Sequence, residues 1–343
     1  MIKLYTDHSL LLPENRKHAH PLIFDLHYYE HTPQSVYEKY QIVDKVEKAD
    51  TIIFPLNYLS KGVSNLQKSY ELLIKLAKTN NKKLLVYTGG DYGKTFNDPN
   101  IITWRNAGFK DSNDKQTFVL PAFMNDPLEN NVVSIQQLEY KKLPHVSFTG
   151  FATASFKEEV RIHLSTLKTN LKRWFKIDHS DYQKVYNAAG KRCSYLKRLE
   201  KTPGVKTDFI YRDKYRAGSK TVEERKKSTR EFFDNLNNSP YTFCLRGAGN
   251  FSVRFYESLA LGKIPVLIDT DVQLPLESVI DWNKHICRMS PAEDLVDVIT
   301  RFHNSHDHES FIELQNSNRS LYERYLNRHA YLCEIHPMLK SIL

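Results

Sequence analysis

Cysteine and long apolar runs are scarce in this sequence, and each scarcity excludes a class of protein. The four cysteines of the 343-residue chain lie far apart in the sequence, at positions 193, 244, 287 and 333. No two have the spacing of a metal-ligand pair, and four are too few for a disulfide scaffold. No run approaches the roughly 18 apolar residues of a membrane-spanning helix. The first residues also lack the apolar core and cleavage site of a secretory signal, so we expect a protein of the reducing cytoplasm.

Low-complexity tracts and internal repeats are missing as well. Apolar residues make up 41% and charged residues 26% of the chain. These values are typical of folded proteins and exclude global disorder. At about 150 residues per domain, the length predicts two domains.

Positive charge is concentrated in one segment of the chain. Residues 191–230 hold 14 Lys or Arg and 5 Asp or Glu, whereas the remaining residues hold 35 of each sign. The formal net charge of +9 therefore resides in this segment. It indicates a surface facing nucleic acid, an acidic membrane surface, or a phosphorylated or acidic substrate. The simpler alternative is a solvated helix face.

Strand-like and helix-like patterns alternate along the chain. In the first half, apolar runs predict strands at 2–6, 51–56, 83–90, 101–104 and 117–123, with a helix over 62–79. The polar segment 125–142 is interpreted as a linker. The second half has predicted strands at 145–151, 241–245 and 264–268, and helices over 156–168, 221–237, 251–262, 291–303, 308–325 and 329–342. This alternation predicts an α/β protein with two parallel sheets.

A glycine-containing loop suited to phosphate follows the strand at 241–245. The loop reads Arg246-Gly247-Ala248-Gly249-Asn250, and a helix begins directly after it. Its glycines permit a tight turn, and the helix amino terminus near Ser252 offers unpaired N–H groups to a phosphate. Arg246 adds a planar, permanently charged donor fork suited to a diphosphate. By themselves the glycines are equally typical of a simple strand–helix turn.

The helix that follows carries two charged residues three positions apart, Arg254 and Glu257. Residues at this spacing lie on one face of a helix. The pair could therefore serve a site together, or form a surface ion pair worth only a few tenths of a kcal/mol.

The order of these residues resembles the exostosin family of glycosyltransferases. The matching string is Phe243-Cys244-Leu245-Arg246-Gly247, Arg254-Phe255-Tyr256-Glu257, Gly262-Lys263-Ile264-Pro265-Val266, Asp269, Leu274-Pro275 and Asp281-Trp282. HVSFTG at 145–150, and GGD at 89–91 with Trp104, are weaker matches. Two features depart from the family pattern. Lys263 stands where animal exostosins commonly have Cys, and the Pro usual before Arg-Gly is missing.

This resemblance implies the GT-B fold, in which two Rossmann-like domains face each other across a cleft. We expect an acceptor-side domain over 1–140 and a nucleotide-sugar-binding domain over 141–324, with a last helix, about 325–343, packing back on the first domain. The implied reaction transfers a hexosyl or pentosyl group, with inversion, from a nucleotide sugar, usually UDP-linked. The implied acceptor is a saccharide or a lipid-linked glycan, as in surface polysaccharide synthesis by a bacterial-like enzyme.

The resemblance also assigns roles to residues. Gly247, Gly249, Asn250 and Ser252 would form the donor site together with Arg246, Arg254 and Glu257. The two arginines would stabilise negative charge on the leaving UDP, and Glu257 would accept hydrogen bonds from both ribose hydroxyls. No metal is required in this scheme, and Asp269-Thr270-Asp271 is interpreted as a turn rather than a metal motif.

An inverting transfer also needs a base that deprotonates the acceptor hydroxyl. Asp91, which follows the strand at 83–90, is the first candidate, and His8, which follows the first strand, is the second. Asp91 is equally typical of a turn and His8 of an exposed surface.

Two other functions remain compatible with the sequence. One is a GDP-sugar-dependent, fucosyltransferase-like enzyme. The other is a non-catalytic protein that binds nucleic acid or another anion through 191–230. Because no nucleic-acid-binding motif is present, we expect this segment to face an anionic acceptor or the inner membrane surface instead.

Overall fold

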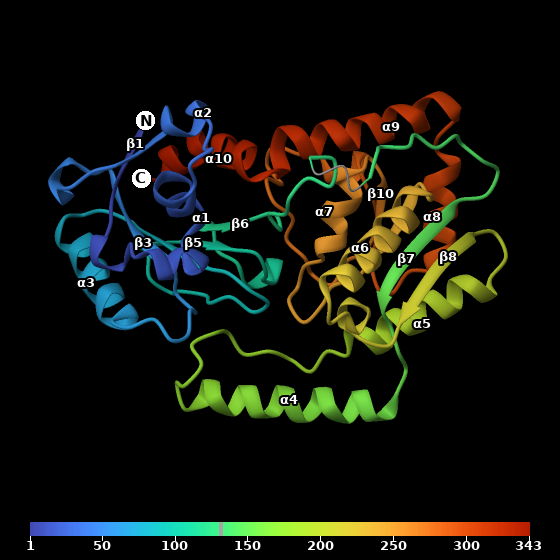
Figure 1. Cartoon of the computed structure of the whole chain (residues 1–343), viewed down its shortest axis with the longest axis horizontal. Helices are drawn as coiled ribbons and strands as arrows, with labels where there is room; N and C mark the ends of the chain where they lie inside the picture. Colours follow the sequence, from blue (N-terminus) through green and yellow to red (C-terminus); the bar gives the residue numbers. More distant parts are fainter. Residues whose placement is uncertain (130–132) are drawn as a thin grey trace.

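The computed structural model describes residues 1–129 and 133–343 and contains two parallel sheets (Figure 1). Their strand orders are β2-β1-β3-β4-β5-β6 and β11-β10-β9-β7-β8. The two sheets, which lie side by side along the long axis of the molecule, confirm the predicted α/β class and the GT-B arrangement of two Rossmann-like domains. Residues 130–132 of the predicted linker lie outside the described residues.

The predicted strands are present in both sheets. The first sheet comprises β1 (Ile2–Tyr5), β2 (Tyr40–Ile42), β3 (Thr51–Asn57), β4 (Leu84–Thr88), β5 (Ile101–Arg105) and β6 (Thr117–Val119). The second comprises β7 (His145–Phe151), β8 (Lys206–Arg212), β9 (Tyr241–Cys244), β10 (Ile264–Ile268) and β11 (Cys287–Met289). All residues of β5, β9 and β10 are buried, as expected for parallel strands covered on both faces.

Helices cover both sheets. They are α1 (Pro21–Ile23), α2 (Gln34–Tyr37), α3 (Leu66–Thr79), α4 (Phe156–Trp174), α5 (Ala188–Lys201), α6 (Val222–Asn237), α7 (Val253–Ala260), α8 (Leu295–Asn304), α9 (His308–Leu321) and α10 (Arg328–Ile342). In the described part of the chain, no helix is both long and apolar enough to cross a membrane.

The last helix, α10, packs on the first sheet. Its buried residues Tyr331, Leu332, Ile335 and Leu339 belong to the hydrophobic core that also contains β1 and β2. The Tyr40 hydroxyl donates a hydrogen bond to the Leu332 carbonyl oxygen at 2.8 Å. The first domain is therefore built from both ends of the chain.

Two loops, one from each domain, contact each other across the domain boundary. The loop after β5 meets the loop after β10, where Phe109 and Val272 form an isolated antiparallel bridge. Beside this bridge, the Lys110 ammonium lies 2.9 Å from the Glu277 carboxylate. These contacts fix the strand ends of the second sheet against the first domain.

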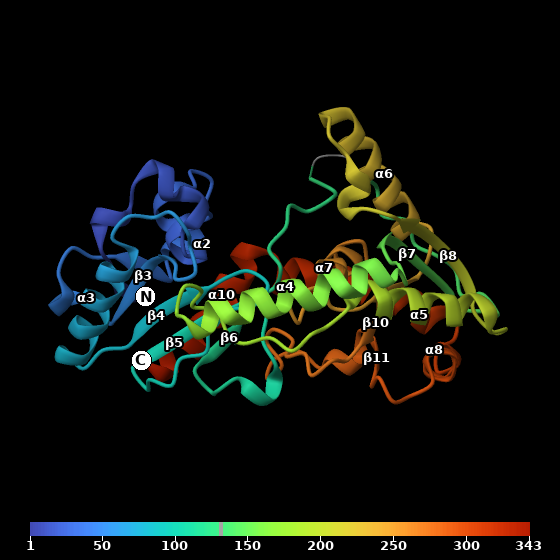
Figure 2. The same cartoon turned by 90° about the horizontal axis from the view of Figure 1, so that it is seen from below.

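Helix α4 lies apart from both sheets and crosses beneath the two domains (Figures 1 and 2). The segment that follows it is tied to the first domain. Both the Thr95 hydroxyl, at 2.8 Å, and the Arg105 guanidinium, at 3.3 Å, donate to the Asp181 carboxylate. The helix thus bridges the space between the domains.

Candidate active site

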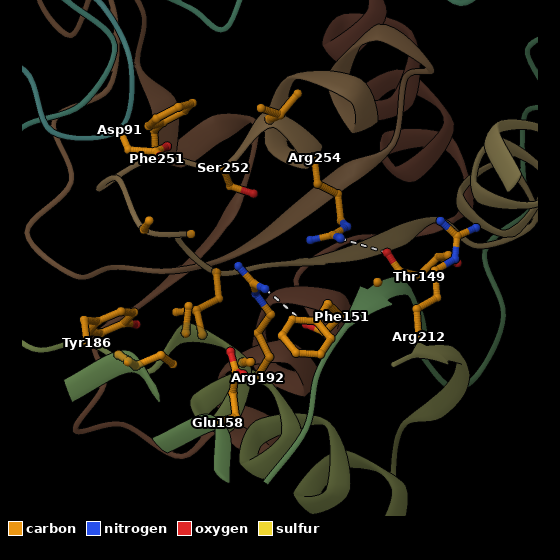
Figure 3. Close-up of a pocket in the computed structure, with 18 of the residues that line it drawn as sticks. Asp91, Thr149, Phe151, Glu158, Tyr186, Arg192, Arg212, Phe251, Ser252 and Arg254 are labelled. Carbon is orange, nitrogen blue, oxygen red and sulfur yellow. Dashed lines mark hydrogen bonds between the residues drawn. The ribbon is translucent and has the colours of Figure 1, made fainter. Parts of the chain in front are cut away.

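A cavity of about 970 Å³ opens between the domains beside α4. Its lining includes Thr149 and Phe151 at the carboxyl end of β7, Gly247 in the loop after β9, and Asp91 from the first domain (Figure 3). Ligands of parallel α/β sheets bind at this end of the strands. The cavity is therefore the candidate active site.

Five arginines line the cavity, and three of them, from different elements, are labelled in Figure 3. Arg254 of α7 donates to the Thr149 carbonyl oxygen at 2.8 Å. Arg192 of α5 donates to the Phe151 and Arg246 carbonyl oxygens at 3.1 and 2.9 Å. Arg212 of β8 donates to the Ser228 carbonyl oxygen and to Glu231, both at 2.8 Å.

Each of these three arginines keeps a buried Nε–H group that finds no acceptor among the described residues. An unpaired buried donor costs about 1–3 kcal/mol, and more when it is charged. Burial and the Arg254 charge lower the pKa of Arg192 to about 10. Such a group of incompletely paired cations favours a multiply charged anion.

Glu257 lies one helical turn from Arg254 and lines the same cavity. Burial raises the pKa of its carboxyl group to about 7, and the Arg254 charge opposes the shift. The face of α7 that carries Arg254 and Glu257 therefore points into the cavity. The interpretation of Arg254 and Glu257 as a surface ion pair is wrong, because both are withdrawn from the outer surface.

Gly247 and Ser252 also line the cavity. Ser252 directly precedes α7, and its side chain makes no capping hydrogen bond. The first N–H groups of the helix are therefore not capped by this hydroxyl, and helix amino termini carry partial positive charge.

Arg246, Gly249 and Asn250 do not line this cavity. The Arg246 guanidinium donates to the Ala248 carbonyl oxygen at 2.8 Å and lies 4.4 Å from the Tyr186 ring centroid. The Asn250 amide donates to the carbonyl oxygens of Gly108, Thr270 and Asp271 at 2.9 to 3.1 Å. Asn250 therefore ties the two domains together. Arg246 was expected to face the diphosphate. Arg192 lines the cavity instead, and the sequence showed it only as one of many cations.

The two candidate bases are placed differently. Asp91 lines the cavity, and its carboxylate accepts a hydrogen bond from the Gly249 N–H. Desolvation raises the pKa of Asp91 above its ordinary value, against the opposing Gly249 hydrogen bond and Arg246 charge. His8 is exposed after β1 and lines none of the described hollows that border the domain gap.

A second hollow of about 450 Å³ adjoins the cavity and shares Asp91 and Tyr92 with it. Its other walls are the loop after β3, with Tyr58 and Lys61, the first turn of α3, with Lys68, and residues 177–180 after α4. Asp91 thus stands where two neighbouring hollows meet.

The Asp269-Thr270-Asp271 segment forms a turn. The Asp269 carboxylate accepts hydrogen bonds from the Val272 N–H at 3.0 Å and from the Arg288 Nε at 2.9 Å. Asp271 has a φ of 63°. No group of three or more His, Cys, Asp or Glu residues that could hold a metal ion occurs in residues 1–129 and 133–343.

Gly247 and Gly249 can be used to test how closely the loop after β9 approaches the Asp91 backbone. A Cβ atom on Gly249 would lie 2.4 Å from the Asp91 carbonyl oxygen, whereas one on Gly247 would come no closer than 3.8 Å to Arg192. We expect Gly249→Ala to lower the free energy of unfolding by about 1–3 kcal/mol, because the domains must separate locally. Denaturant unfolding measures this, and Gly247→Ala should change it little. Equal effects of the two variants would contradict the close contact.

Two solved structures that the chain is similar to are distant from it in sequence. TarM of S. aureus has 11% identity and a TM-score of 0.35, over 94% of this chain and 58% of TarM. This chain therefore spans less than two thirds of TarM. HepE of Anabaena, solved with UDP, has 10% identity and a TM-score of 0.39, over 99% of this chain and 100% of HepE.

Comparison of sequences gives one family. No curated protein matches the chain. The family model described as the Exostosin GT47 domain matches residues 154–301. This range includes the loop after β9, α7 and the cavity residues Arg192, Arg212 and Arg254. Residues 154–301 are therefore similar to the exostosin GT47 domain.

Proposed function

We propose that the cavity binds a UDP-sugar and that the protein transfers its sugar, with inversion, to a saccharide or lipid-linked glycan. The observation that carries this proposal is the grouping of Arg192, Arg212 and Arg254, each with an unpaired Nε–H, in one cavity. Guanidinium groups bind phosphate oxygens through paired, charge-assisted hydrogen bonds. A diphosphate there would supply opposite charge and hydrogen-bond acceptors to the guanidinium groups.

In this scheme, the Glu257 carboxylate accepts hydrogen bonds from the ribose hydroxyls of the donor. An ionised carboxylate has only acceptors, which suits a vicinal diol. When the sugar leaves, negative charge develops on the diphosphate. The arginines and the amino terminus of α7 stabilise that charge, so the proposed reaction needs no metal ion.

The acceptor enters through the second hollow. Asp91 takes the proton from the acceptor hydroxyl as its oxygen bonds to the anomeric carbon, while the bond from that carbon to the diphosphate breaks on the opposite face. Lys61 and Lys68 in the hollow favour an anionic acceptor. We further propose that the reaction takes place in the cytoplasm.

Calorimetric titration with UDP and GDP, in the presence of a chelator, tests the donor assignment. We expect UDP to bind at least about tenfold more tightly than GDP, a difference of about 1.4 kcal/mol, with no effect of the chelator. Tighter binding of GDP would favour the fucosyltransferase-like alternative. Binding of neither nucleotide would contradict the proposal and favour a non-catalytic protein.

A further inference from the structure

One face of α4 carries a continuous row of exposed apolar side chains. Phe156 is 80% exposed, Leu164 62%, Leu167 58% and Trp174 73%, and Val160 and Leu171 lie between them in the same row. Their spacing of three and four residues keeps all six on one side of the helix. Monomeric proteins rarely expose so many large apolar side chains together, so this row indicates a partner.

The row points away from the protein. Ile162, Ser165 and Thr166, on the opposite side of α4, line the cavity. At the end of the helix, Arg173 is buried and hydrogen-bonds to Ser180 and Asn170. In Figures 1 and 2, α4 forms the outermost layer of this side of the molecule. No described part of the chain covers the apolar row.

Cations border the row along one flank. Lys157, Lys168 and Lys172 are all exposed, and each lies next to a residue of the row in sequence. Arg161 is not counted with them, because it is ion-paired with Glu158 and lines the cavity. Beyond the helix, Phe175 and Ile177 continue the apolar surface at 68% and 69% exposure, with Lys176 between them. Leu and aromatic residues on one face, with Lys and Arg at its border, are typical of helices that lie in a membrane interface.

We propose that α4 docks on a membrane surface that contains anionic lipids, with its axis parallel to the membrane plane. The apolar row would enter the boundary between headgroups and acyl chains, and the flanking cations would meet lipid phosphates. The helix has 19 residues and is therefore about 28 Å long, which is long enough for all six side chains to insert together.

A second copy of this chain fits the row less well than a membrane does. In a twofold-symmetric antiparallel pair of helices, the same flank of each helix meets its counterpart. Lys157, Lys168 and Lys172 of one copy would then face the same cations of the other, and like charges repel. Anionic headgroups instead complement this flank.

Docking through α4 would bring the cavity close to the membrane, because the helix lines the cavity with its inner face. The enzyme could then bind an acceptor carried on a lipid while it stays bound to the membrane. This surface is separate from the donor-binding residues, so membrane binding and UDP binding can be measured independently.

Vesicle flotation tests the proposal directly. We expect the full chain to float with vesicles of phosphatidylcholine mixed with phosphatidylserine, and more weakly with vesicles of phosphatidylcholine alone. The Leu164→Glu/Leu171→Glu variant should partition at least about tenfold less, since two apolar side chains no longer insert. Leu72→Glu on α3 is the matched control, because Leu72 is 52% exposed and lies outside the row.

Tryptophan emission gives a second readout. Trp174 is exposed, whereas Trp104 and Trp282 are buried at 0% and 4% exposure, so a shift to shorter wavelength on adding vesicles reports Trp174. Unchanged emission, flotation equal to that of the double variant, or a dimer that the double variant dissociates would overturn the proposal. Both variants should keep the UDP affinity of the wild-type protein, and loss of that affinity would instead indicate damage to the fold.

Discussion

Glu257→Ala should weaken UDP binding by about 100-fold or more. In the proposed complex, the carboxylate accepts hydrogen bonds from two ribose hydroxyls, and hydrogen bonds to a charged group contribute about 1.5–3 kcal/mol each. The variant also leaves the Arg254 charge without its nearest carboxylate, which lies one helical turn away. Calorimetric titration with UDP measures the loss, and an affinity within threefold of the wild-type value would contradict the ribose role.

The same residue predicts how UDP affinity depends on pH. Burial raises the pKa of Glu257 to about 7 in the free protein, so about half of the molecules carry a protonated Glu257 at neutral pH. Because UDP binds the ionised form, binding releases a proton from the protonated molecules. Affinity should therefore fall as the pH drops below about 7 and level off above about 8.

Glu257→Gln is the control for this pH dependence. The amide has nearly the same shape, but it does not titrate. The variant should bind UDP weakly and with an affinity that is constant between about pH 6 and 8. If the UDP affinity of the variant still changed with pH, the pH dependence would belong to a group other than Glu257.

Asp91→Asn should lower kcat by about 100- to 10,000-fold, the range over which general bases contribute. The amide cannot take the proton of the acceptor hydroxyl, although it can still fill the space beside Gly249. UDP affinity should change little, because Asp91 is not among the proposed donor ligands. The measurement is sugar transfer from a UDP-sugar at saturating donor concentration, combined with UDP titration of the same variant.

His8→Ala is the matched control for Asp91→Asn. His8 was the second candidate base on sequence, but it is exposed and lines neither hollow. It should retain wild-type kcat. A loss in His8→Ala with full activity in Asp91→Asn would reverse the assignment.

The elements predicted correctly are those whose sequences carry an unambiguous apolar pattern. Six successive residues of β3 and all of β10 are buried, and their apolar runs predicted strands. The elements missed have mixed patterns. Strand β8 reads Lys-Thr-Asp-Phe-Ile-Tyr-Arg and lies at the edge of its sheet, where one side meets solvent. Most of helix α5 lies in the basic segment 191–230, where the many charged residues obscured its four buried positions.

Site residues that lie close together in the sequence could be predicted, and those brought in from far along the chain could not. The motif after β9 pointed to Gly247, Ser252, Arg254 and Glu257, which line the cavity because they are close together in the chain, and their role in donor binding stays a prediction. Arg192 could not be predicted, since 54 residues separate it from Arg246, whose carbonyl oxygen it contacts. Packing of α5, β8 and α6 in the second domain decides which cations of 191–230 turn toward the cavity.

The position of α10 also sets an order for folding during synthesis. The core of the first domain lacks Tyr331, Leu332, Ile335 and Leu339 until nearly the whole described chain has been made. The second sheet and its helices are complete earlier, because all their residues lie between 145 and 321. Domains generally fold as units while the ribosome extends the chain. The domain that comes second in the sequence is therefore the first that can reach its native structure, and the first domain waits for the last helix.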